Sequence, residues 1–253
     1  MFAHLKSLFK APVPESPSVI DRLAYAIGDI HGRFDLFERM IERIRHDSEG
    51  LGERPLIVLL GDYVDRGPAS RQVLERIVRL YVEDWCDVEA LMGNHEEAML
   101  QFLRDPGYGV SWAEYGGSAT LASYGVSTPS LRTDPTAWAE ACEALNAALP
   151  EAHLDLLRNL KVMMQIGDYL FVHAGVSPNL PLAEQGPQEF LWIRGAFLEA
   201  DRACDFVVVH GHTPEDVPTN QRWRIGIDSG AYATGVLTAM RLRQAERTLL
   251  QVR

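Results

Sequence analysis

Two carboxylates and a guanidinium occur within one short segment, residues 61–67, directly after an apolar run. The run, residues 56–60, is long enough for a buried strand and too short to cross a membrane. Asp62 and Asp65 would repel each other at the end of a buried strand unless a cation neutralised them. Arg66 beside them is well shaped to hold an oxyanion such as phosphate. The segment is therefore either part of a metal and phosphate site or a solvated turn with a local ion pair.

Polar residues of the same kinds follow several other apolar runs. They are Asp29 with His31, Asn94 with His95, His173, and His212 after Gly211. A single His at a strand end is most often structural, and a single Asp after Gly usually belongs to a turn, but five such loops in one chain are hard to explain as turns. Imidazole together with carboxylate suits Mn, Fe or Zn better than Ca. The absence of Cys from these loops argues against a structural zinc site.

The composition narrows the class of protein. The chain has 253 residues, 47% of them apolar, which is enough for one large domain or two small ones with a sizeable core. Its formal charge of −11, with no basic run, argues against a nucleic-acid-binding surface. The cysteines Cys86, Cys142 and Cys204 form no CxxC pair and indicate free thiols. With no membrane-length apolar stretch and no signal peptide, we expect a cytoplasmic protein without membrane contacts.

Alternating strands and helices must position the polar loops. Short apolar strands are predicted over residues 23–27, 56–60 and 88–92, and amphipathic helices over 34–44 and about 70–82. Each strand ends in one of the polar loops, which predicts α/β layering with the loops gathered at the carboxyl ends of the strands.

The rest of the chain divides into a lead-in, a helical insert and more strands. Residues 1–18 are expected to form a flexible lead-in, residues 19–253 a single folded domain, and residues 97–160 several short helices that form a cap. Further strands are predicted over residues 162–166, 169–173 and 206–210, and antiparallel strands over 223–228, 236–242 and 248–252.

The five loop motifs together resemble those of the calcineurin-type metallophosphoesterases. They read GDIHG at 28–32, GDYVDRG at 61–67, GNHE at 93–96, HAG at 173–175 and GHT at 211–213, in the family's order. The form YVDRG is most similar to the phosphoprotein phosphatase branch, in a bacterial or phage type. The resemblance implies an αββα sandwich, in which two mixed β-sheets are flanked by helices, with a small helical cap.

The resemblance also implies a site for two divalent metal ions, with Mn favoured over Fe or Zn. The ligands it implies are Asp29 and His31 on the first ion, the bridging Asp62, and Asn94, His173 and His212 on the second. A hydroxide shared by the two ions would attack phosphorus in line, so that no covalent phosphoenzyme is needed.

Further residues are implied to act on the substrate. His95 would be the general acid that protonates the leaving alkoxide, or else only pack beside the metal ligands, and Asp65 would hold its imidazole in the useful tautomer. Arg66, Arg194 and Asn94 would contact the substrate phosphate, with an ordinary surface arginine as the alternative for Arg194.

Two other polar residues near the motifs have smaller roles. Asp228 either supports a ligand histidine or is a turn residue, and His210 is expected to belong to a strand and not to bind metal.

These features favour a metal-dependent serine/threonine protein phosphatase that acts on a phosphorylated protein or peptide, with phosphotyrosine as a further target. The alternative is a symmetrical dinucleoside tetraphosphate hydrolase, a related branch with the same metal loops. The YVDRG form and the absence of a basic cap favour the protein phosphatase. A third hypothesis, a catalytically inactive interaction module, predicts lost ligands, whereas this chain carries every ligand type.

Overall fold

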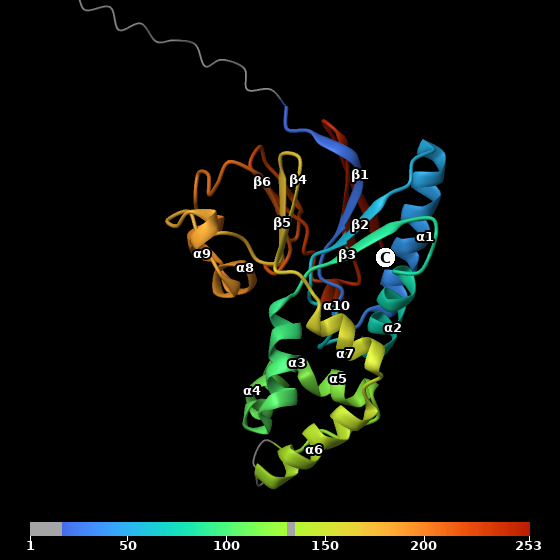
Figure 1. Ribbon diagram of the computed structural model, residues 1–253, viewed down its shortest axis with the longest axis vertical. Helices are drawn as coiled ribbons and strands as arrows, with labels where there is room; N and C mark the ends of the chain where they lie inside the picture. Colours follow the sequence, from blue (N-terminus) through green and yellow to red (C-terminus); the bar gives the residue numbers. More distant parts are fainter. Residues whose placement is uncertain (1–16, 131–134) are drawn as a thin grey trace, which may run out of the picture.

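Two five-stranded sheets form the centre of the computed structural model, which describes residues 17–130 and 135–253 (Figure 1). The first sheet has the order β10-β9-β1-β2-β3 and the second the order β4-β5-β6-β8-β7. The strands of the first sheet are β1 (Ile20–Ile27), β2 (Leu56–Leu59), β3 (Asp87–Ala90), β9 (Leu237–Gln244) and β10 (Glu246–Val252). Those of the second are β4 (Met163–Ile166), β5 (Tyr169–Val172), β6 (Val207–His210), β7 (Thr219–Asn220) and β8 (Arg224–Gly226).

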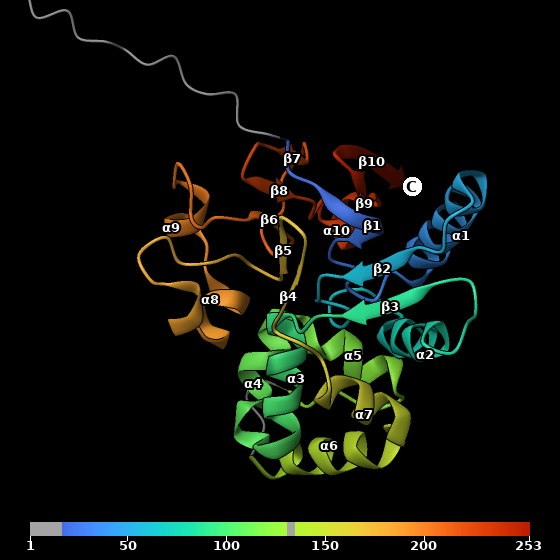
Figure 2. The ribbon, with the colours of Figure 1, turned by 45° about the horizontal axis from the view of Figure 1, so that its top comes forward.

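Side-chain alternation along the strands divides the core into layers. In β1, Tyr25 and Ile27 pack in the cluster that includes α1 (Phe34–Leu51) and α2 (Ser70–Leu80), whereas Ala24 and Ala26 face the second sheet. Helices α8 (Pro187–Trp192) and α9 (Gly195–Leu198) cover the other face of the second sheet, as Figure 2 shows. The helix–sheet–sheet–helix order confirms the predicted αββα sandwich of two mixed sheets.

The described part of residues 97–160 is helical, as predicted. It contains α3 (Asn94–Arg104), α4 (Gly109–Trp112), α5 (Ser118–Ser123), α6 (Pro135–Ala148) and α7 (Glu151–Arg158), with a 3-10 turn η1 (Pro106–Tyr108) and a π-helical turn η2 (Ala113–Gly117). Figure 1 shows these elements below the sheets, next to the carboxyl ends of β2 and β3. The helical insert therefore lies beside the polar loops and can contribute side chains to them.

The structure corrects several boundaries and one strand direction. Helix α1 extends to Leu51 instead of ending at residue 44, and the expected loop over residues 178–190 contains the start of α8. The tail was expected to be antiparallel throughout; β9 pairs antiparallel with β10 and β8 with β7, but β8 pairs parallel with its other neighbour, β6. Side chains alternate with the same period in parallel and antiparallel strands, so the sequence pattern does not report direction. The predicted lead-in lies almost entirely outside the described residues.

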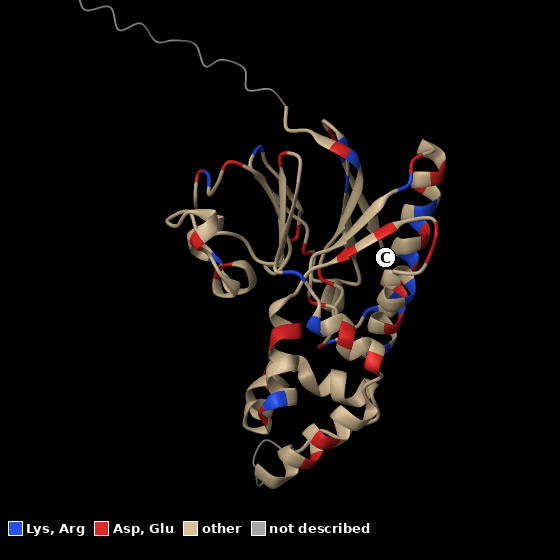
Figure 3. Cartoon of the chain, viewed as in Figure 1, with Lys and Arg blue, Asp and Glu red and all other residues tan. Residues whose placement is uncertain are grey.

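Charged residues lie on the helices and loops and on some of the strands, such as β3. Figure 3 shows both signs along α1 and α2, whereas β5 and β6 carry none. Within the described residues, no helix has both the length and the apolar character needed to cross a membrane.

Candidate active site

All six predicted metal ligands lie together where the parallel strands end. Asp29 and His31 follow β1, Asp62 follows β2, Asn94 follows β3, and the two histidines His173 and His212 follow β5 and β6. Each side chain is buried. Because β1, β2 and β3 run parallel in one sheet and β5 and β6 run parallel in the other, their carboxyl ends meet between the sheets.

Unusual backbone conformations aim these ligands at one another. His31, Asp62 and His212 have positive φ values of 45°, 54° and 65°. Non-glycine residues in this region cost about 1–2 kcal/mol each and cluster at functional sites. Gly61 also has a positive φ, and a Cβ there would lie 2.6 Å from the backbone nitrogen of Gly93. The two loops can approach this closely only because a glycine stands at position 61.

Glu96 joins the loops after β2 and β3, a role that the sequence analysis did not assign. Its carboxylate accepts hydrogen bonds from four backbone N–H groups, those of Asp62 at 2.8 Å, Gly93 at 2.9 Å, Tyr63 at 2.7 Å and Val64 at 3.1 Å. Charge-assisted bonds of this kind are stronger than neutral ones. The buried Glu96 therefore fixes the bridging position of Asp62. Its place in the GNHE motif was the only sequence signal for this role.

Two histidines direct their Nε2 atoms at the Asp62 carboxylate, with His31 neutral and His173 protonated as long as no cation is bound. The Nδ1 atoms of His31 and His173 lie 2.9 Å and 2.8 Å from backbone carbonyl oxygens, which can only accept, so both Nδ1 atoms carry hydrogen. In the neutral rings, each Nε2 then directs its lone pair at Asp62, with both Nε2–carboxylate distances 3.4 Å. A lone pair and a carboxylate repel each other at this distance, and a cation bound between them would be coordinated by both. In its absence, burial lowers the pKa of His173, but Asp62 outweighs burial and raises it to about 10.

His212 and Asn94 complete a second group of donors. The Nδ1 of His212 lies 2.9 Å from Asn94 Oδ1 and 3.2 Å from His173 Nε2. The buried Nε2 of His212 has no hydrogen-bond partner in the described part of the chain. Burial, together with the His173 charge, lowers the pKa of His212 to about 2, so the ring is neutral. A neutral imidazole next to the Asn94 amide oxygen and a second imidazole provides the kinds of donor that fit a site for a cation.

Asp62 belongs to both groups of side chains that could hold an ion. One group is His31, Asp62 and His95, the other is Asp62, His173 and His212, and within each group the ligand atoms lie within 4.8 Å of one another. This shared position fits the predicted bridging carboxylate. Asp29 is not in either group. Both of its oxygens accept from the backbone N–H of His212 at 3.1 Å, and burial with the neighbouring Asp228 raises its pKa well above the ordinary value.

His95 and Asp65 form a buried pair beside the ligand cluster. The Nδ1 of His95 lies 2.7 Å from Asp65 Oδ2. The same carboxylate accepts from Trp112 Nε1 at 2.9 Å and from Thr120 Oγ1 at 2.6 Å. Burial lowers the pKa of His95, but the carboxylates of Asp62 and Asp65 outweigh it and the pKa is raised. The two carboxylates therefore favour the protonated form of His95, as a general acid requires, while in this structure its Nε2 accepts a hydrogen bond from Arg66 Nη2 at 3.1 Å.

Trp112 and Thr120 come from the helical insert and were not anticipated. They lie 47 and 55 residues after Asp65 in the chain. Nothing in their local sequence indicates that they hold a catalytic carboxylate, because the contact arises only when α4 and α5 pack beside the loop after β2.

Two arginines lie at the site, in different environments. Arg66 Nη2 is 3.1 Å from His95 Nε2, and its guanidinium lies 4.7 Å from the ring centroid of Tyr232. Arg194 is exposed and donates from Nη1 to Thr213 Oγ1 at 3.2 Å, beside His212. Among the described residues, neither guanidinium has a carboxylate partner, so both positive charges are available to an anionic ligand.

Asp228 and His210 lie next to the site, and Asp228 is close enough for its charge to act on Asp29 and Asp62. Asp228 Oδ1 accepts from the backbone N–H of Gly230 at 2.8 Å, which favours the turn alternative, and no hydrogen bond joins it to a ligand histidine within the described ranges. His210 donates from Nδ1 to the carbonyl of Gly211 at 2.9 Å, and its Nε2 lies 3.2 Å from Arg224. Both nitrogens of His210 are thus engaged away from the ligand cluster.

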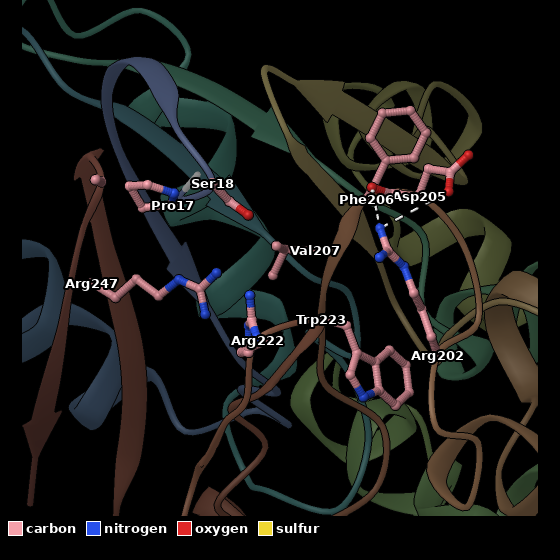
Figure 4. A pocket seen from close by; sticks show the side chains of 10 residues that line it. Pro17, Ser18, Arg202, Asp205, Phe206, Val207, Arg222, Trp223 and Arg247 are labelled. Carbon is pink, nitrogen blue, oxygen red and sulfur yellow. Dashed lines mark hydrogen bonds and ion pairs between the residues drawn. The ribbon is translucent and has the colours of Figure 1, made fainter. Parts of the chain in front are cut away.

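A separate pocket of about 360 Å³ lies at the opposite ends of the strands. Figure 4 shows Arg222 and Arg247 on one side of it and Arg202 with Trp223 on the other. Its wall includes Val207, the first residue of β6, whereas His212 follows the end of that strand. This pocket is therefore remote from the ligand cluster.

Comparison with known proteins places this geometry among phosphoesterases. The profile of the calcineurin-like phosphoesterase family matches residues 24–235. An asymmetrical bis(5'-nucleosyl)-tetraphosphatase of Anoxybacillus flavithermus is 24% identical over 87% of this chain and 90% of its own length. A symmetrical bis(5'-nucleosyl)-tetraphosphatase of Acidovorax ebreus is 31% identical over 61% of this chain, but the match spans only 44% of that protein.

A solved structure shows the same fold over nearly the whole chain. It is provisionally described as a diadenosine tetraphosphatase and superposes with a TM-score of 0.66 and 19% identity, covering 94% of this chain and 98% of that one. At this identity the likeness concerns the fold alone.

Proposed function

Because the chain belongs to the calcineurin-like phosphoesterase family, we propose that it is a metal-dependent hydrolase of dinucleoside tetraphosphates. The observation that carries phosphoester hydrolysis is the convergence of buried carboxylates and imidazoles on Asp62, next to the His95–Asp65 pair and Arg66. The choice of a dinucleotide over a phosphoprotein is supported by the relatives, several of which are named for tetraphosphate hydrolysis.

The chain's own residues have separate tasks in this reaction. Asp29, His31, Asp62, Asn94, His173 and His212 would hold two divalent cations. When bound, such a pair of ions supplies Lewis acidity toward phosphoryl oxygens and a nucleophile from water near neutral pH. Arg66, Arg194 and the amide of Asn94 would bind the non-bridging oxygens of the phosphate that is attacked. His95 would donate its proton to the oxygen of the departing phosphate as the anhydride bond breaks, while Asp65 keeps the ring oriented.

A phosphoserine and phosphothreonine phosphatase is the second candidate, and one specific observation favours it. The His95–Asp65 pair is buried, and the pKa of His95 is raised. An acid held in this way is most useful when the leaving group is a strongly basic alkoxide. The YVDRG form of residues 63–67 also favours this candidate, whereas the names of the relatives favour the dinucleotide hydrolase.

A comparison of the hydrolysis rates of two substrates tests the proposal. Manganese-loaded protein is assayed with diadenosine tetraphosphate and with a phosphothreonine peptide at equal concentrations, and kcat/KM is determined for each. The proposal expects the larger value for the dinucleotide. A much larger value for the peptide would overturn it in favour of the second candidate. Chromatography of the products then separates symmetrical cleavage, which gives two ADP, from asymmetrical cleavage, which gives ATP and AMP.

The metal centre is tested with a matched pair of variants. Asp62→Asn should lose bound metal and at least about 100-fold in kcat, because it removes the carboxylate shared by both donor groups. Asp84→Asn makes the same change on an exposed residue of the α2–β3 connection and should keep both. Reconstitution of metal-free protein with Mn, Fe or Zn, followed by metal analysis, tests the preference for manganese. Full activity and metal content in Asp62→Asn would contradict the assignment.

A further inference from the structure

Three partly exposed aromatic side chains surround the catalytic groups, and the roles proposed above use none of them. Tyr115 comes from η2, Trp192 from the end of α8, and Tyr232 from α10 (Ala231–Thr234). Tyr115 is 45% exposed and Tyr232 is 40% exposed. We refer to Tyr115, Trp192 and Tyr232 as the aromatic rim. Large exposed rings next to a buried polar centre indicate a surface that a ligand covers.

Tyr115 is held against the general acid from both sides. Its ring centroid lies 6.5 Å from that of His95. The next residue, Gly116, has a φ of 110° and accepts a hydrogen bond from the backbone N–H of Arg66 at 3.2 Å. Three residues earlier, Trp112 donates to Asp65. The backbone that carries Tyr115 is therefore fixed to the Asp65–Arg66 loop, which places the ring beside the catalytic pair.

Trp192 approaches the same place from the other wall of the site. Its ring centroid lies 6.5 Å from that of Tyr115, at an interplanar angle of 67°, and 6.5 Å from that of His212. Its indole N–H donates to Glu97 Oε2 at 2.7 Å, so the polar atom of the ring already has a partner. What remains for a ligand is the apolar face of the indole.

Tyr232 differs from the other two rings because a protein cation already occupies its face. The guanidinium of Arg66 lies 4.7 Å from its centroid, and the edge contact with His31 has a centroid distance of 5.4 Å. Tyr232 therefore positions Arg66, and the open part of the aromatic rim consists of Tyr115 and Trp192.

We propose that Tyr115 and Trp192 bind the nucleobase of the leaving nucleotide, the one whose departing phosphate oxygen His95 protonates. This inference rests on the proposed function, and it names the part of the substrate that the metal and phosphate contacts do not recognise. The departing phosphate oxygen takes its proton from His95, and the phosphate and ribose that connect this oxygen to the base give the base the length to extend past His95 onto the wall that carries Tyr115 and Trp192. A planar base can stack on one ring of the pair and meet the other at its edge, and both arrangements are favourable between aromatic groups. Stacking on rings is tolerant of base identity, so the site accepts adenine and guanine alike.

The test compares two substrates that share anhydride bonds and differ in the nucleoside. Diadenosine tetraphosphate and inorganic tripolyphosphate are assayed with manganese-loaded wild type, Tyr115→Ala and Tyr115→Phe. The loss of one stacking ring should raise the KM for the dinucleotide about 5- to 150-fold in Tyr115→Ala. The KM for tripolyphosphate should stay unchanged, and Tyr115→Phe should resemble wild type for both. Tyr81→Ala removes a tyrosine that is 48% exposed outside the site and serves as the matched control.

Equilibrium binding gives a second measurement that is independent of turnover. ADP should quench tryptophan fluorescence in the wild type through contact with Trp192, and both Trp192→Phe and Tyr115→Ala should reduce that change.

The possible failures point to different conclusions. If wild type cleaves diadenosine tetraphosphate and Tyr115→Ala leaves its KM unchanged, the nucleobase site is wrong while the proposed function stands. If Tyr115→Ala raises the KM for tripolyphosphate equally, Tyr115 acts on the phosphate or on His95, and the nucleobase site is again wrong. If wild type cleaves only the phosphothreonine peptide, the proposed function fails and the nucleobase site fails with it.

Discussion

The replacement of His95 by Asn should reduce turnover by an amount that depends on the leaving group. His95 donates a proton only to the departing oxygen, so its loss matters most when that oxygen is strongly basic. A serine alkoxide is such a leaving group. The terminal phosphate of ADP has a second pKa of about 6, so it departs near neutral pH with little help from an acid. The comparison of a phosphoserine peptide with diadenosine tetraphosphate therefore isolates the role of His95.

The structure sets the expected size of the effect. His95 and Asp65 are 1% and 0% exposed, and their 2.7 Å contact is supported by two further donors to the carboxylate. A well-positioned acid contributes about 10²- to 10⁴-fold. We expect His95→Asn to lose at least about 100-fold in kcat, or about 3 kcal/mol, with the phosphoserine peptide. With diadenosine tetraphosphate the loss should be about 10-fold or less. Metal content should not change.

The pH dependence follows from the direction of the pKa shift. An acid acts only in its protonated form, and in the metal-free protein Asp62 and Asp65 raise the pKa of His95 against the effect of burial. Because metal ions would neutralise Asp62, Asp65 is the carboxylate that favours the protonated form in the loaded enzyme, and turnover of the peptide should fall as the pH rises through the pKa of His95. Asp65→Asn removes one of the two carboxylates, so the fall should move to lower pH.

The assay is steady-state turnover with both substrates, and metal analysis of each variant. His46→Asn makes the same substitution on an exposed histidine of α1 and should behave as wild type. An equal loss with both leaving groups would refute the acid role. A loss of metal in His95→Asn would show that His95 is itself a metal ligand. This outcome is compatible with the structure, because His95 lies in one group of possible ligands with His31 and Asp62.

Three other changes test the supporting residues. Glu96→Gln should lower the free energy of unfolding by about 2–3 kcal/mol in urea denaturation, because a neutral amide replaces a carboxylate that accepts four backbone N–H groups; an unchanged midpoint would count against its role in joining the loops. Arg66→Ala should raise the KM for diadenosine tetraphosphate about 10-fold or more, whereas Arg71→Ala, an exposed arginine on α2, should not; equal kinetics would remove Arg66 from the phosphate site. Thr120→Val removes the 2.6 Å hydrogen bond to Asp65 and should lower peptide turnover about 10-fold with metal content intact, so wild-type turnover would show that Asp65 does not depend on it.

The ligand residue types and the alternation of elements could be predicted from the sequence because both are local properties. A buried strand followed by glycine and a polar residue places that residue at a strand end, and the carboxyl ends of parallel strands meet. For this reason Asp29, Asp62 and Asn94 could be assigned to one site before the structure was known. The αββα order followed from the family resemblance that the five motifs carry.

The contacts that make the loops a working site come from tertiary packing. Trp112 and Thr120 reach Asp65 across 47 and 55 residues, which no local pattern encodes. The parallel direction of β8 depends on its hydrogen-bond partner β6, because side chains alternate identically in both directions. The meeting of Tyr115 and Trp192 beside His95 likewise requires η2 and α8 to converge from opposite walls. The sequence alone thus predicted which residues would hold metal and phosphate, and only the tertiary structure decided what surrounds them, because side chains distant in the chain become neighbours only when the layers pack.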